Sequence, residues 1–168
     1  MRRGTIAALV IYILAINGSA FPQATPSVPQ RWPSLVDLFS ENLVKVVEAS
    51  GNGFSSIKGA PDPTSSGKGW FSTVGLPSSH QCLVWIHRVH SRGSRYSCEM
   101  VNFHDAQDDY RWYLQIVSES LPGWTKSDNP DTSSKTAKFT KSSLHASVAL
   151  RLTKPSTGGY LLYLDVNP

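Results

Sequence analysis

The sequence is poor in cysteine and in charged side chains. Cysteine occurs twice among 168 residues, and Asp, Glu, Lys and Arg together make up 17% of the chain. Two cysteines can form only one internal disulfide. The formal net charge is +4 at pH 7. This modest basicity argues against the broad basic surface with which proteins bind nucleic acid.

The sequence also lacks an apolar run long enough to cross a membrane. Its longest apolar run, residues 6–16, follows Arg2 and Arg3 and precedes small residues that end at Ala20. A membrane-spanning helix needs about 20 apolar residues, whereas this layout is typical of a secretory signal peptide. We therefore expect residues 1–20 to be cleaved, which lowers the formal charge to +2, and the protein to be secreted or periplasmic. Retention of this segment as an anchor is the alternative.

Proline is concentrated directly after this segment. Residues 21–33 contain four prolines, and proline fixes φ and removes a hydrogen-bond donor, so we expect an extended tether. The remaining residues, 34–168, are enough for one domain with a core that needs neither repeats nor a metal. No cofactor is expected.

Residues 34–50 have the apolar spacing of a helix with one broad buried face. Ser34 can cap its start, and Gly51 can take the left-handed conformation that ends it. The positions predicted to be buried are Leu35, Leu38, Phe39, Leu43, Val46 and Val47, with Val36 and Val44 at their flanks.

A second helix is predicted from Asp105 to Leu121. Asp105 can cap it, and Pro122-Gly123 ends it. Because capping explains Asp105, the nearby Asp108 and Asp109 are not expected to form a metal site. One face of this helix is lined by Tyr110, Tyr113, Leu114, Val117 and Leu121, whereas Trp112 and Ile116 fall on the other side.

The remaining segments predict strands. The sequence gives modest strands at 53–60 and 67–75, a hairpin of 82–90 with 95–103, and, after the polar run 125–136, alternating strands at 144–153 and 160–166. The inward residues of the last two are Leu144, Ala146, Val148, Leu150 and Leu152, and Tyr160, Leu162, Leu164 and Val166. We therefore predict an α+β domain of order α-β-β-β-β-α-β-β, with an antiparallel sheet of about five to seven strands and both helices on one face.

The predicted hairpin contains both cysteines. If Arg92-Gly93 is a two-residue turn, Cys82 lies opposite Phe103 and Cys98 opposite His87. The two cysteines would then face opposite sides of the sheet, about 17 Å apart along the strands, and an ideal hairpin would exclude a bridge. A longer loop or a bulge would permit it, so a Cys82–Cys98 disulfide stays an open alternative.

The same hairpin carries histidines and arginines at its tip. His87 and His90 are three residues apart, which places them on opposite faces of a strand, so no metal site is expected there. Arg88, Arg92 and Arg95 form a basic cluster that can attract phosphate, sulfate or carboxylate groups. The alternative is that these charges only keep the hairpin soluble.

Motifs of catalysis are missing. No G-x-S-x-G elbow occurs, and Gly67-Lys68 lacks the first glycine and the Ser or Thr of a phosphate-binding loop. His80, which follows two serines, is the first candidate for a catalytic base. Among the aromatic residues, most of which should be core, Trp112 is the candidate for a partner surface.

These observations favour a small exported, non-catalytic domain that binds a protein partner or a ligand in the cell envelope or outside the cell. Two alternatives remain. One is an extracytoplasmic hydrolase with a histidine base such as His80. The other is a polyanion-binding protein that uses the tip with Arg88, Arg92 and Arg95.

Overall fold

The computed structural model describes residues 34–86, 93–102, 105–130, 134–156 and 158–168. The predicted signal peptide, the predicted tether and the tip of the predicted hairpin lie outside these ranges. The described residues belong to one compact unit, Pro33–Pro168. No helix in this part of the chain is long and apolar enough to span a membrane.

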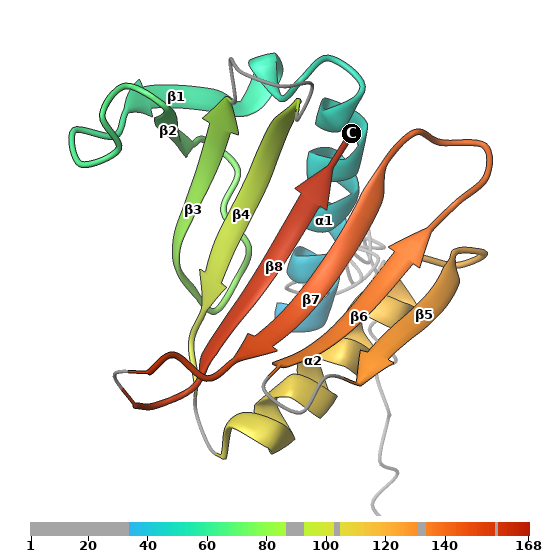
Figure 1. Cartoon of the computed structure of the whole chain (residues 1–168). Coiled ribbons are helices and arrows are strands. Elements are labelled where there is room, and N and C mark those ends of the chain that lie inside the picture. The colour runs from blue at the N-terminus through green and yellow to red at the C-terminus, as the bar shows by residue number, and fades with distance from the viewer. Residues whose placement is uncertain (1–33, 87–92, 103–104, 131–133, 157) are drawn as a thin grey trace, which may run out of the picture. The chain divides into compact units, whose positions relative to one another are not determined.

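The described residues form one sheet of eight strands and two helices (Figure 1). In chain order the elements are α1 (Leu35–Ser50), the short 3-10 helix η1 (Ser55–Ile57), β1 (Lys58–Pro61), β2 (Gly69–Ser72), β3 (Ser79–Ile86), β4 (Ser94–Met100), α2 (Ala106–Ser120), β5 (Thr125–Pro130), β6 (Ser134–Thr140), β7 (Ser147–Thr153) and β8 (Leu161–Asn167).

All neighbouring strands are antiparallel, in the order β1-β2-β3-β4-β8-β7-β6-β5. Strands β1 to β4 and strands β5 to β8 thus form two meanders, each preceded by a helix, and the β4–β8 pair joins them. Both helices lie behind the sheet in Figure 1, α1 against β4 and β8 and α2 against β7 and β8. The predicted α+β class and the placement of both helices on one face are confirmed.

The sheet has more strands than the five to seven predicted. The additional pairing comes from the polar run 125–136, which contains all of β5 and the start of β6. Strand β5 lies at the edge of the sheet and pairs with β6 over six positions. An edge strand needs no apolar alternation when both its sides meet water, so the pattern in the sequence could not reveal it.

Helix α1 begins as predicted, with a capping box in which the Ser34 hydroxyl accepts a hydrogen bond from the Asp37 amide and the Asp37 carboxylate accepts one from the Ser34 amide. Its buried face is narrower than predicted, because only the sides that meet the sheet and α2 are covered. Leu35, Leu38 and Val44 are exposed.

The left-handed turn after α1 comes later than predicted. Gly51 has φ −62° and remains right-handed, whereas Gly53 and Phe54 both have φ 65°. The Phe54 side chain is fully buried, so burial of its ring offsets the cost of a left-handed backbone at a residue with a Cβ.

Helix α2 is covered on two sides. Its Tyr113 hydroxyl donates to the carbonyl oxygens of Ser78 (3.1 Å) and Val101 (3.2 Å) at the end of the β3–β4 pair, while the Ser120 hydroxyl lies 2.7 Å from that of Ser40 on α1. Ile116, predicted to face away from the stripe, is therefore buried. Asp105 caps the helix as predicted, accepting from the Gln107 amide at 2.8 Å.

The residues predicted to point inward from β7 and β8 are buried, with two exceptions. Ala146, Val148, Leu150, Leu152, Leu162, Leu164 and Val166 are buried. The exceptions are Leu144 and Tyr160, which are exposed and lie before the strands begin at Ser147 and Leu161.

The register of β3 and β4 differs from the two-residue turn and allows the disulfide. Cys82 pairs directly with Cys98, and the last described pair is Ile86 with Ser94. This pairing differs from the predicted one by five residues, an odd number, so both cysteines lie on the same face of the sheet. Their Cα atoms are 4.1 Å apart and the two sulfurs are bonded. The bridge lies in the core, between the sheet and the helices.

Candidate functional site

One face of the sheet has no helix over it among the described residues. Residues whose side chains point to the helices alternate along each strand with residues that point the other way. In β4 the inward residues are Tyr96, Cys98 and Met100, and in β8 they are Leu162, Leu164 and Val166. We call the opposite side, formed by the alternate residues of β2 to β8, the open face.

The β2–β3 side of the open face is apolar. Phe71 on β2 pairs with Leu83 on β3, and Trp85 lies two residues further along the same strand. Phe71 is 37% exposed, and the other two side chains are half-buried. Large apolar side chains that stay partly in water on a sheet face are a common feature of binding surfaces.

The centre of the open face carries a buried carboxylate. Asp165 on β8 is only 3% exposed, although no helix covers it. Its cross-strand neighbours are the small residues Ser97 on β4 and Ala149 on β7, which leave room for longer side chains to close over it. Those side chains are arginines.

Two arginines from different strands flank Asp165. The Nε of Arg151 on β7 donates to Asp165 Oδ2 at 2.5 Å, and the Nε of Arg95 on β4 lies 4.0 Å from Oδ1. We call Arg95, Asp165 and Arg151 the Arg-Asp-Arg cluster. Its formal charge is +1, because one carboxylate faces two guanidiniums.

The hydrogen bonding of the cluster is incomplete. Arg95 Nε and Asp165 Oδ1 are both buried and have no hydrogen-bond partner among the described residues. An unpaired buried polar atom costs about 1–3 kcal/mol. The side chains of Arg95 and Arg151 nevertheless keep 37% and 34% of their surface in water. For Arg95, this exposed surface belongs to atoms other than the buried Nε.

Tyr163 extends the cluster along β8. The Arg151 guanidinium carbon lies 5.5 Å from the centre of the Tyr163 ring, a cation–π geometry. Burial raises the pKa of the Tyr163 hydroxyl above its usual value, and the carboxylates of Glu99 and Asp165 raise it further, while Arg151 lowers it. The hydroxyl therefore stays protonated at neutral pH as a neutral donor.

The predicted basic tip is only partly described. Arg88 and Arg92 lie outside the described residues, as do His87 and His90. Arg95 lies on β4, where its side chain turns to Asp165 on the open face. The structure thus brings Arg95 together with Arg151, a residue that was not among the predicted site residues.

His80 lies on β3, and its side chain is exposed. No hydrogen-bond partner of its imidazole occurs within the described residues. The adjacent Ser79 hydroxyl donates to the Leu76 carbonyl oxygen at 2.6 Å. A serine nucleophile would instead donate its proton to the histidine base.

Trp112 lies on α2, on the helical side of the sheet, and is 38% exposed. Its ring contacts the Tyr113 ring edge to face, with the ring centres 4.7 Å apart. The structure therefore separates Trp112 from the open face, and the two are alternative partner surfaces.

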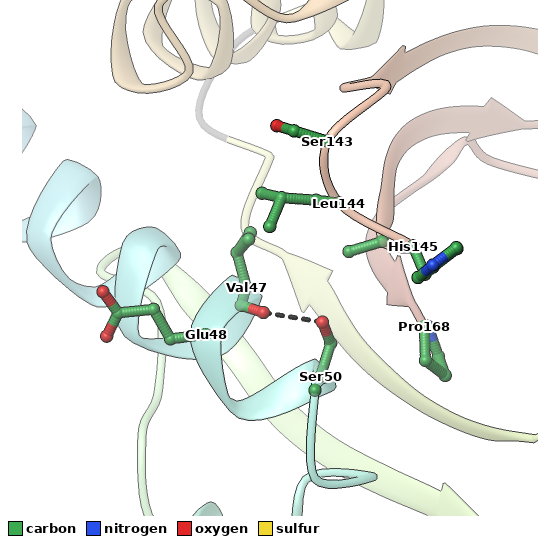
Figure 2. A pocket seen from close by; sticks show the side chains of 9 residues that line it. Val47, Glu48, Ser50, Ser143, Leu144, His145 and Pro168 are labelled. Carbon is green, nitrogen blue, oxygen red and sulfur yellow. Dashed lines mark hydrogen bonds between the residues drawn. The ribbon is translucent and has the colours of Figure 1, made fainter.

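A cavity of about 390 Å³ lies between the end of α1 and the residues before β7 (Figure 2). Val47 and Leu144 point toward each other across it, whereas the Glu48 carboxylate is directed away from His145. The Ser50 hydroxyl donates to the Val47 carbonyl oxygen at 2.6 Å. The cavity thus offers an apolar contact, with no acid, base and nucleophile facing one another.

Within the described ranges, no group of three or more His, Cys, Asp or Glu side chains is arranged to hold a metal ion. Comparison of the chain with known protein families, with curated proteins and with solved structures finds no match.

Proposed function

We propose that this chain is an exported, non-catalytic binding domain that holds a segment of a partner protein against the open face of its sheet. The observation that carries the proposal is the combination of Phe71, Leu83 and Trp85 with the Arg-Asp-Arg cluster on a single uncovered surface. Protein interfaces are enriched in aromatic and arginine side chains.

The charges on the open face indicate which kind of partner segment would fit it. The charged side chains on the open face are Arg95, Arg151 and Lys138, against Asp165 and Glu99, a net charge of +1 within the described residues. A segment that carries an apolar side chain next to an acidic one would complement both the apolar side and the basic centre.

Export is part of the proposal. It is supported by the apolar run after Arg2 and Arg3 and by the Cys82–Cys98 bridge, since disulfides persist mainly in oxidising compartments. A fusion of residues 1–20 to a reporter that is active only outside the cytoplasm would test it. Loss of reporter activity when the apolar run is interrupted by a charged residue is the expected result.

The binding proposal can be tested with a matched pair of variants. Peptides are selected from a random phage-displayed library on immobilised protein, and their affinities are then measured for Phe71→Ala and Trp112→Ala. The two side chains are almost equally exposed, 37% and 38%, and lie on opposite sides of the sheet. We expect Phe71→Ala to weaken binding roughly tenfold and Trp112→Ala to leave it unchanged.

The opposite result, in which only Trp112→Ala weakens binding, would place the partner on the helical side and contradict the proposal. A library that yields no saturable peptide would contradict it as well. The cavity beside Val47 is tested in the same assay by Leu144→Ala, which we expect to have no effect.

A further inference from the structure

We infer that the two guanidiniums of the Arg-Asp-Arg cluster form a site for a single carboxylate group. The inference rests on the proposed function, because the site lies on the open face, and it specifies the chemical group that this face recognises. Its starting point is the unusual position of Asp165, a carboxylate buried on a face without a helix.

The Asp165 carboxylate lies at the Nε edge of both guanidiniums. The Arg151 Nε donates a hydrogen bond to Asp165 at 2.5 Å, whereas the Arg95 Nε lies 4.0 Å from the carboxylate and is not hydrogen-bonded to it. The Nη groups of both side chains have no hydrogen-bond partner among the described residues. Asp165 thus holds Arg151 by a hydrogen bond and attracts Arg95 by charge alone, while the Nη donors of both stay available, which is the arrangement a ligand oxyanion requires.

The same carboxylate selects the charge of the ligand. Two guanidiniums around one carboxylate leave one positive charge, which a monoanion neutralises. A doubly charged phosphate would add a second negative charge near Asp165, whose burial leaves little water to screen the repulsion. Glu99, on the same face beside Tyr163, adds to this repulsion. A planar, singly charged carboxylate therefore fits better than phosphate.

The surroundings indicate what the carboxylate is attached to. Trp85 pairs with Arg95 across β3 and β4, and Leu83 pairs with Ser97 next to the cluster. The site therefore continues into the apolar side of the open face. Two sources share this chemistry, an acidic side chain beside an apolar one in a protein segment and a free aromatic or aliphatic carboxylic acid.

Arginine Nε–Hε signals in nitrogen–proton NMR spectra of the ¹⁵N-labelled protein report directly on this site. The protein is titrated with benzoate, with benzamide as the uncharged analogue, and with inorganic phosphate, all at constant ionic strength. We expect saturable shifts of the Arg95 and Arg151 signals with benzoate and none with benzamide. Arg111, an exposed arginine on α2 that pairs with Asp108, is the internal control and should not respond.

Substitutions complete the test. Arg151→Gln should weaken benzoate binding roughly tenfold, the loss expected for a charge-assisted hydrogen bond, while Arg111→Gln should leave it unchanged. Arg151→Lys, which keeps the charge and lacks the planar fork, should also weaken it. Retention of the dispersed amide spectrum shows that each variant is folded, and the Arg95 signal remains as a probe in both.

Three outcomes would overturn the inference: shifts that do not saturate, equal shifts with benzamide, or phosphate binding at least as tight as benzoate binding. The selected peptides distinguish a carboxylate on a protein segment from a free carboxylic acid. They also distinguish failure of the carboxylate site from failure of the proposed binding function. If replacing their Asp or Glu by Asn or Gln weakens binding, the carboxylate comes from a protein segment. If they bind through Phe71 without any response of the arginines, the proposed function stands and the carboxylate site is wrong.

Discussion

Reduction of the Cys82–Cys98 bridge should lower the free energy of unfolding by about 3 kcal/mol. The two cysteines are 16 positions apart and close a loop of 17 residues. In the chain-entropy description, closing a loop of this size removes about 3 kcal/mol of conformational freedom from the unfolded chain. For a domain of this size, the loss corresponds to a fall of about 10 °C in melting temperature.

The comparison that isolates the bridge is between the oxidised and the reduced wild-type protein. The bridge is buried in the core, so a double substitution to alanine would also create a cavity and exaggerate the effect. Urea denaturation with and without a reductant gives the two free energies of unfolding, and mass spectrometry after alkylation verifies the state of the thiols.

A difference below about 1 kcal/mol would refute this reasoning. It would mean that the unfolded chain is not restricted by the loop, or that the β3–β4 register is different from Cys82 opposite Cys98. Free thiols in protein prepared under oxidising conditions would refute the register directly.

Three further outcomes follow from single contacts. Ser34→Ala removes the cap of α1 and should cost about 1 kcal/mol in thermal unfolding. Burial, together with the Asp109 carboxylate, raises the pKa of Tyr113 to about 12, so stability should be complete below pH 10 and fall as the pH rises toward 12. Tyr113→Phe should make that part of the pH profile of unfolding less steep, while Tyr96, whose pKa burial also raises, keeps part of the slope. Asp165→Asn leaves two guanidiniums without a carboxylate and should lower the free energy of unfolding by about 2 kcal/mol. This is less than the loss for a fully buried ion pair, because the arginines keep about a third of their surface in water. The double variant with Arg151→Gln should lose less stability than the sum of the two single variants.

The spacing of apolar residues was enough to predict the elements that bury one side in the core. Helices α1 and α2 and the inner residues of β7 and β8 repeat apolar residues at 3.6 or 2 positions, because those residues face a single core. The caps at Ser34 and Asp105 could be predicted because they depend only on neighbours along the chain.

Register and edges could not be predicted in the same way. The pairing of Cys82 with Cys98 depends on the length of the connection after Ile86, and a change of one residue there exchanges the faces of every side chain on the strand. Strand β5 is held by its pairing with β6, which leaves no apolar pattern in its own sequence.

The sequence indicates which face the members of the Arg-Asp-Arg cluster occupy, but not that they meet. In β8, Asp165 falls between the inward residues Leu164 and Val166, which assigns it to the outward face, and Arg151 falls on the outward face of β7 by the same alternation. That these two meet, and that Arg95 joins them, depends on the β4–β8 and β7–β8 registers, which no local pattern contains.

The β4–β8 pair also determines when the sheet can form during synthesis of the chain. Strand β8 lies in the middle of the sheet and follows the other seven described strands in the sequence, so the β4–β8 pair that joins the two meanders cannot form before residues 161–167 have been made. A nascent chain that stops earlier exposes one side of β4 and one side of β7. Arrest of translation before residue 161 should therefore yield a species that proteases digest readily.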